Sequence, residues 1–175
     1  DIDVREYGSG NAGATNTFRV LGKKAGIPVL LIDAFKGFAA VSLVHLFTEE
    51  PISTEAFVNY QLGLGIAAVI GHIFPLFAGF RGGKGIATLL GLMLGIHPEG
   101  ALLALVVFLL VFALTRFVSL GSMSAAISFP FLIVLVFQAT VPSLIIFSMF
   151  VAILVLVTHQ KNIERLVRRE ENKAN

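Results

Sequence analysis

The sequence predicts an all-α protein, a polytopic transmembrane helix bundle of about six membrane segments joined by glycine-rich cytoplasmic loops. Its 175 residues are 56% hydrophobic and only 14% charged, whereas a soluble domain carries about 25% charged residues. The mean hydropathy is +0.88, and a soluble globule could not hide so much apolar surface. Because apolar runs fill most of the chain, we expect one membrane-embedded domain over residues 1–175, with its chemistry in loops and helix ends.

Six apolar segments account for the predicted membrane helices. Windows of about 19 residues place them at 27–47, 57–79, 86–96, 101–115, 118–138 and 142–159. The third is shorter than the roughly 20 residues of a spanning helix, so we expect it to be tilted, re-entrant or half buried by its neighbours. The bundle then covers 27–159, between a glycine-rich loop at 1–26 and a basic tail at 160–175.

The distribution of charge predicts the orientation in the membrane. Of the 13 lysine and arginine residues, all but Lys36 fall in alternate loops that share one side of the bundle. The opposite connections carry Glu49, Glu50, Glu55 and Glu99 and no basic residue. Cytoplasmic loops carry the excess of lysine and arginine in membrane proteins, so we expect the basic loops to face the cytoplasm.

The first basic loop, GSGNAGATNTFR from Gly8 to Arg19, is dense in glycine and hydrogen-bonding side chains. Glycines let backbone amides approach an anion, hydroxyl and amide side chains add neutral donors, and arginine can donate two bonds to one phosphate. This composition favours an anion site over a flexible linker, which is usually more monotonous. The candidate residues are Ser9, Gly10, Asn11, Gly13, Thr15, Asn16 and Arg19.

The same loop matches the dinucleotide-binding spacing at Gly8, Gly10 and Gly13, with Asp33 twenty residues further on. We reject this match, because the motif requires a βαβ unit and residues 27–47 read as a membrane helix.

The second basic loop surrounds Lys84 with Gly82, Gly83 and Gly85. Backbone amides and the ammonium group can converge on one anion there, and a helix starting near Ile86 would direct its dipole to the same point. The spacing is not that of a nucleotide P-loop, which has glycine where Ala78 stands and serine or threonine after the lysine. For His72, packing or capping is favoured over catalysis.

Two further clusters lie on the predicted cytoplasmic side. Arg116, Ser119 and Ser122 stand between two apolar segments, and His159 and Asn162 share a helical face at the end of the last one. Both arrangements suit contact with a substrate. The tail beyond them, with Arg168, Arg169 and Lys173, favours contact with anionic lipid head groups.

Asp33 and Lys36 share a face inside the first apolar segment, where each can neutralise the other. An ionised group at the bilayer centre costs about 2.5–3.5 kcal/mol on insertion scales, so such groups mark either function or a buried pair that joins two helices. The sequence leaves both readings open.

Four motifs in order, GSGNAGATNTFR, GHIFPLFAGFRGGKGIAT, TRFVSLGS and HQKNIER, resemble the acyl-phosphate-dependent glycerol 3-phosphate acyltransferases of bacteria, the PlsY family. The resemblance covers nearly the whole chain. It implies transfer of a fatty acyl group from acyl phosphate to the sn-1 hydroxyl of glycerol 3-phosphate, which gives lysophosphatidic acid and phosphate. It also implies a multi-pass protein of the bacterial inner membrane, with a cytoplasmic active site, contact with membrane lipids, and no nucleic-acid partner.

The resemblance assigns roles to the candidates. Arg19 and Lys84 would clamp phosphate and ease its departure with help from Ser9 or Asn11, and His159 and Asn162 would orient glycerol phosphate. The base stays open between His159 and a substrate phosphate oxygen, as does the choice between Ser119 and Ser122 as a substrate contact. We expect no cofactor, no metal and a monomer. Members of the family usually carry another helix before the first loop, and we expect this chain to lack it.

Rival classes make different demands on the sequence. A transporter or channel for phosphate or an organic anion would also use broken, glycine-rich helices, but it needs a polar path to the outer face. A structural scaffold has little use for repeated glycine and basic loops. A metal-dependent lipid-phosphate transferase would need a cytoplasmic acidic cluster for magnesium, which the chain lacks. The absence of cysteine excludes disulfides and thiolate chemistry.

Overall fold

The computed structural model describes residues 2–52 and 54–174, and these residues form helices and no strand. The α-helices are α1 (Ala14–Leu21), α2 (Lys23–Ser42), α3 (Glu55–Ile73), α4 (Ile86–Ile96), α5 (Pro98–Thr115), α6 (Val118–Phe131), α7 (Pro142–Thr158) and α8 (Gln160–Val167). Short 3-10 turns occupy Val4–Glu6, Leu43–Leu46 and Leu76–Ala78, and a π-turn at Leu132–Val136 extends α6 just after Pro130.

Each of the six predicted apolar segments is a helix, from α2 to α7. Within the described residues, four helical stretches are long and apolar enough to cross a membrane: Lys23–Leu46, Glu55–Ala78, Pro98–Thr115 and Val118–Val136. The bent pair of α7 and α8 makes a fifth. With 11 residues, α4 extends about 16 Å, about half of a bilayer core. The all-helical membrane bundle is confirmed, and the short third segment is a half-length helix held among longer ones.

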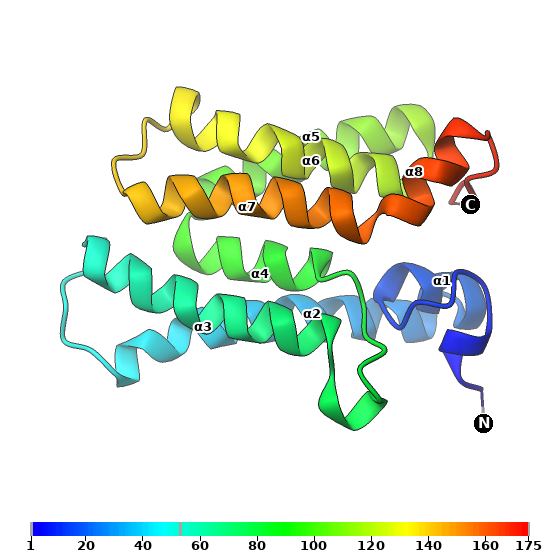
Figure 1. The fold of residues 1–175 in the computed structure, drawn as a ribbon, viewed down its shortest axis with the longest axis horizontal. Helices are drawn as coiled ribbons and strands as arrows, with labels where there is room; N and C mark the ends of the chain where they lie inside the picture. The colour runs from blue at the N-terminus through cyan, green and yellow to red at the C-terminus, as the bar shows by residue number, and fades with distance from the viewer. Residues whose placement is uncertain (1, 53, 175) are drawn as a thin grey trace.

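The basic loops meet at one end of the bundle. In Figure 1, α1, α8, both termini and the loops before α4 and α6 all lie at the same end, and the loops after α2 and α6 lie at the opposite end. We call the first of these the basic end, because all basic residues except Lys36 belong to its loops and adjoining helix ends. The chain therefore alternates between two ends as the charge pattern predicted.

Helix α4 is the central element, because it packs against α2, α3 and α5. Its contact with α2 is closest where glycines face backbone. An added Cβ at Gly37 would overlap the carbonyl oxygen of Thr88, and one at Gly91 would overlap that of Ala34. Small residues allow such close approach between membrane helices. The fully buried Leu92 of α4 and Val41 of α2 complete this part of the core.

The last apolar helix ends at a sharp corner. Helices α7 and α8 meet at an angle of 61°, and His159 is the residue between them. This bend turns α8 across the basic end, so that the tail after it folds back over the loop between α5 and α6, where the Ala174 amide donates to the Arg116 carbonyl oxygen at 2.9 Å.

Candidate active site

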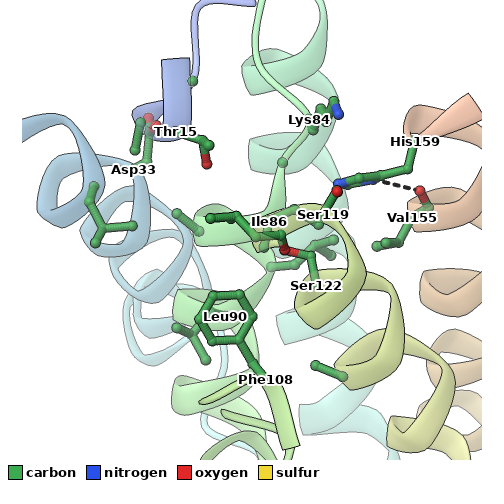
Figure 2. A pocket seen from close by; sticks show the side chains of 18 of the residues that line it. Thr15, Asp33, Lys84, Ile86, Leu90, Phe108, Ser119, Ser122, Val155 and His159 are labelled. Carbon is green, nitrogen blue, oxygen red and sulfur yellow. Dashed lines mark hydrogen bonds between the residues drawn. The ribbon is translucent and has the colours of Figure 1, made fainter. Parts of the chain in front are cut away.

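One cavity of about 760 Å³ extends from the basic end into the bundle. Its end nearest the basic loops, called here the polar end, is lined by Thr15, Arg19, Lys84, Ser119 and His159 among others. Further in, the lining is mostly apolar and comes from α2, α4, α5, α6 and α7, and Asp33 of α2 and His72 of α3 also line the cavity. Figure 2 shows the two regions: Lys84, Ser119 and His159 lie on one side of the view, and Leu90 and Phe108 lie deeper. The cavity can therefore hold a ligand with an anionic head and an apolar chain.

The first glycine-rich loop is held by a buried asparagine. Asn16 is 1% exposed, its Oδ1 accepts the Ser9 amide at 2.8 Å, and its Nδ2 donates to the carbonyl oxygens of Val4 and Tyr7. All of its polar atoms are thus used within the loop. Asn16 was a predicted substrate contact, and its side chain shapes the loop instead of offering free donors.

Helix α1 presents its amino-terminal end and one exposed face to the cavity. Gly13 caps the helix, and its amide donates to Asn11 Oδ1 at 2.9 Å. Thr15 and Arg19 follow one turn apart on the same face, and both line the cavity. The amino-terminal end of a helix carries partial positive charge, so α1 adds to the attraction that Arg19 exerts on an anion.

The second loop is fixed to the end of α3. The amides of Gly82 and Gly83 donate to the carbonyl oxygens of Ile73 and His72, each at 3.2 Å. These carbonyls belong to the last turn of a helix, where they have no partner within the helix. The two amides were expected to face an anion, but they are committed to α3. These glycines serve instead to bring the loop close to α3, since an added Cβ on either one would overlap His72.

The end of the same loop opens α4 toward the cavity. Gly85 has φ of +81°, a left-handed conformation that other residues adopt at a cost, and α4 begins at Ile86 as predicted. Gly85, Ile86 and Ala87 all line the cavity. The amino terminus of α4 therefore faces the same cavity as the amino terminus of α1.

Lys84 lies between the two helix ends and is paired with Asn162. Its Nζ donates to Asn162 Oδ1, and the Nδ2 of that asparagine donates to Glu171 Oε1 at 2.6 Å. Burial lowers the pKa of Lys84 to about 8, with Glu171 opposing the shift and Arg165 and Arg19 adding to it. The amine is mostly protonated at neutral pH and is less hydrated than a surface lysine, so it can bind an anion closely.

Glu171 is a central residue of the site that the sequence did not single out. Its carboxylate accepts from Ser119 Oγ, Asn162 Nδ2 and Arg165 Nε at 2.6–2.7 Å. Burial opposes its ionisation, but the hydrogen bonds from Arg165, Ser119 and Asn162 outweigh that effect, and the pKa of Glu171 lies below its usual value. Glu171 is one of three glutamates in the tail, with Glu164 and Glu170, and nothing local indicated that the tail folds back.

His159 has a fixed tautomer. Its Nδ1 lies 2.8 Å from the Val155 carbonyl oxygen, the contact dashed in Figure 2. A carbonyl only accepts, so Nδ1 carries the proton and Nε2 keeps its lone pair. The ring therefore offers Nε2 to a ligand as a hydrogen-bond acceptor.

The structure brings most of the predicted residues together. Twelve line the cavity: Ser9, Asn11, Gly13, Thr15, Asn16, Arg19, Lys84, Gly85, Ser119, Ser122, His159 and Asn162. Four of the predicted residues do not: Gly10, Gly82, Gly83 and Arg116. Arg116 has φ of +64° and stacks over Phe112, with its guanidinium 5.8 Å from the ring centre. Of the two serines, Ser119 donates to Glu171 and Ser122 to the Val118 carbonyl oxygen.

The hydrogen-bond donors of the polar end all suit an anionic ligand. Cationic side chains, hydroxyls, an amide and two helix amino termini converge, and among the described residues no three histidine, aspartate or glutamate side chains group as metal ligands. Donors of this kind bind phosphate and stabilise charge that develops on oxygen. The fold and the site together define an integral membrane protein with a cavity that is polar at the basic end and apolar within the bundle.

Comparison with known proteins identifies the family. The model of the glycerol-3-phosphate acyltransferase family matches residues 1–169. Glycerol-3-phosphate acyltransferases of Chlorobaculum parvum and Chlorobaculum tepidum are 44% and 43% identical, over 98% of this chain and 84% of theirs. The crystal structure of PlsY, an integral membrane glycerol 3-phosphate acyltransferase, in its glycerol 3-phosphate form is 36% identical, with a TM-score of 0.86 over 99% of this chain and 83% of that one. Its lysophosphatidic acid form gives 37% and 0.80 over 95% and 81%.

The chain therefore belongs to the glycerol-3-phosphate acyltransferase family, and it is a membrane acyltransferase. This confirms the resemblance drawn from the four motifs. It also favours the enzyme over the transporter that the glycine-rich loops left as an alternative.

Proposed function

We propose that this protein transfers a fatty acyl group from acyl phosphate to the sn-1 hydroxyl of glycerol 3-phosphate, giving lysophosphatidic acid and inorganic phosphate. The observation that carries the proposal is one continuous cavity with cations at its mouth and mostly apolar walls within. Both substrates are phosphates, and the donor also has a long apolar chain. One cavity of this kind can hold the donor's chain in the bundle and both phosphates at the polar end.

The donor fits the chemistry of the site. Acyl phosphate is a mixed anhydride that is already activated, so the reaction needs no covalent enzyme intermediate. Positioning and stabilisation of charge are then the main tasks. We assign Arg19 and Lys84 to the phosphates, with the amino-terminal amides of α1 and α4 and the side chains of Ser9 or Asn11 assisting.

The transfer step breaks one bond and forms one. The hydroxyl oxygen of glycerol 3-phosphate attacks the acyl carbon, the bond between that carbon and the phosphate oxygen breaks, and phosphate leaves with the electron pair. We assign a phosphate oxygen of the substrate as the final proton acceptor, a base that the reactants themselves supply. His159 Nε2 then accepts a hydrogen bond from the attacking hydroxyl and directs it, and Asn162 keeps Lys84 in place.

The charge pattern supports a location in the bacterial inner membrane with the polar end toward the cytoplasm. We propose that residues 1–175 act as one domain and as a monomer. Because the chain has no cysteine, Lys161→Cys and Glu49→Cys can be labelled individually in intact cells. An impermeant maleimide should label the variant at 49 and spare the variant at 161, and the opposite result would reverse the orientation.

The function is tested by phosphate release and lysophosphatidic acid formation from palmitoyl phosphate and glycerol 3-phosphate. Lys84→Ala and His159→Ala should each lower kcat/KM by about 100-fold or more, as loss of a charge-stabilising or orienting group does. Lys24→Ala is the matched control, because Lys24 is an exposed cation of the basic end that does not line the cavity. Equal activity of all three variants would refute the assignment of the site.

A further inference from the structure

We propose that Asp33 and His72 are positioning residues that hold Gly83 and thereby direct Lys84 into the cavity. Asp33 fixes the imidazole of His72, and His72 contacts the backbone directly before Lys84. The inference rests on the proposed function, since it assigns the purpose of two buried residues to the same site. Neither residue has a role in the transfer step derived above.

Asp33 is an ionisable group inside the membrane-spanning part of α2. It is 8% exposed, its Oδ1 accepts from Lys36 Nζ at 2.6 Å, and His72 Nδ1 of α3 lies 3.3 Å from the same oxygen. A carboxylate costs several kcal/mol in the hydrocarbon region unless it is paired. One partner would be enough for neutralisation, and Lys36 is that partner. The contact with His72 therefore has a separate consequence, which is to orient the ring.

His72 lies in the last turn of α3 and its side chain is only 7% exposed. A ring nitrogen that faces a carboxylate carries its proton, so Nδ1 points to Asp33 and Nε2 points the other way. The atom that an added Cβ at Gly83 would meet first is this Nε2. The imidazole thus fills the space between Asp33 and Gly83.

The backbone of His72 contacts the same glycine. Its carbonyl oxygen accepts the Gly83 amide at 3.2 Å, and the neighbouring Ile73 carbonyl accepts the Gly82 amide. On the opposite side, an added Cβ at Gly13 would lie 3.8 Å from Gly83 Cα. Gly83 is thus held between His72 and the start of α1, and the next residue is Lys84. A tilt of the His72 ring would shift the loop and withdraw the amine from the cavity.

The test measures where Lys84 lies as well as how fast the enzyme works. In the parent, the pH profile of kcat/KM should show a basic limb near 8 from Lys84, whose pKa burial lowers to about 8 in a site that Arg19, Arg165, Glu171 and His159 share. If Asp33→Asn and His72→Ala loosen the loop, Lys84 becomes more hydrated and this apparent pKa rises toward 10.5, its ordinary value. We expect kcat/KM to fall by about 10- to 100-fold at the same time, as misplacement by about 1 Å does.

A purely structural role would give a different result. It would lower the fraction of active enzyme and leave KM and the apparent pKa unchanged. His97→Ala is the matched control, because His97 caps α5 at the opposite end by accepting the Gly100 amide and does not line the cavity. This variant should lose stability without any shift of the pH profile.

Direct contact between the ring and the glycine is tested by a double variant. Gly83→Ala alone should lower kcat/KM, because its methyl group would overlap the His72 ring. Addition of His72→Ala makes room for that methyl, so kcat/KM of the double variant should be about 10-fold higher than that of Gly83→Ala. Such non-additive effects are expected of residues in contact. If His72→Ala alone folds poorly, the near-isosteric Asp33→Asn variant carries the test of the pH profile.

The outcomes separate this inference from the proposed function. A parent protein that makes no lysophosphatidic acid from the two substrates would refute the proposed function itself. A working parent with unchanged kcat/KM and pH profiles in Asp33→Asn and His72→Ala, or with additive losses in the double variant, would overturn the positioning role alone.

Discussion

The depth of the cavity predicts which acyl chains the enzyme uses. Buried residues from four helices close its inner end: Met93, Ala101, Phe129 and Val151. Along α5, the lining runs from Phe112 to Ala101, a distance of about 16 Å at about 1.5 Å per residue. Carbon–carbon bonds of about 1.5 Å in a staggered, extended chain advance about 1.25 Å each. The cavity therefore suits chains of about fourteen carbons.

Ala101→Leu should shorten that preference. Leucine adds three carbons at a position that is 2% exposed, and it removes the room of about two methylene groups. Each buried methylene contributes about 0.8 kcal/mol, so a sixteen-carbon chain loses about 1.6 kcal/mol relative to a twelve-carbon chain. The ratio of kcat/KM for palmitoyl over lauroyl phosphate should fall about 15-fold.

The assay is a competition of both donors for glycerol 3-phosphate, with the two lysophosphatidic acids quantified by mass spectrometry. Ala113→Leu is the control, because Ala113 lies on the same helix, is exposed and does not line the cavity. Its product ratio should match that of the parent. An unchanged ratio in an active Ala101→Leu enzyme would refute the assignment of the inner cavity to the acyl chain.

Three further predictions follow from the polar network and the packing. In the parent, kcat/KM should fall as pH rises through about 8, because only protonated Lys84 holds a phosphate. Lys84→Arg should move that fall above pH 10. A fall near pH 8 in both the parent and the variant would exclude Lys84 as its origin. Glu171→Gln should lower the free energy of unfolding by about 3 kcal/mol, because three donors lose a carboxylate acceptor. Glu171→Gln should also move the fall of kcat/KM below pH 8, since the negative charge of Glu171 raises the pKa of Lys84. An unchanged pH profile would contradict the electrostatic interaction between Glu171 and Lys84. Gly91→Ala should lower the free energy of unfolding in detergent by about 1–3 kcal/mol, because the added methyl would overlap α2. Gly63→Ala is the control, because its Cβ would meet nothing within 4 Å. Equal melting temperatures of the two variants would contradict the close packing of α2 and α4.

Much of the fold was predictable because membrane helices depend on local composition. Each apolar segment of the sequence became a helix, and the basic loops share one end, since hydropathy and charge act residue by residue. The half-length of α4 was visible in the sequence, but its central position was not. That position depends on Gly37 and Gly91 facing backbone from another helix, which only the packed bundle determines.

The site was predictable where a motif carries its own chemistry. Lys84, His159 and Asn162 come from distant loops, and the structure brings all three to one cavity. The destinations of their neighbours were not predictable. The amides of Gly82 and Gly83 bind the end of α3, and the same loop could have turned them toward a ligand without any change of sequence.

The tail shows the limit of reading residues in order. Glu171 completes the network around Asn162 and Arg165 because α8 turns by 61° at His159 and the chain folds back after it. Neither the bend nor the return is encoded in local periodicity. Arg116 shows the converse case. It was predicted as a substrate contact because it is a basic residue in a cytoplasmic loop, but its side chain stacks over Phe112.

The most direct test of the central claim compares acyl donors. Purified enzyme is mixed with glycerol 3-phosphate and either palmitoyl phosphate or palmitoyl-coenzyme A, and lysophosphatidic acid and inorganic phosphate are measured together. A polar end built to hold two phosphates, with an inner cavity for the chain, predicts product only from palmitoyl phosphate, with one phosphate released for each lysophosphatidic acid. Product from the thioester and none from the acyl phosphate would contradict the account.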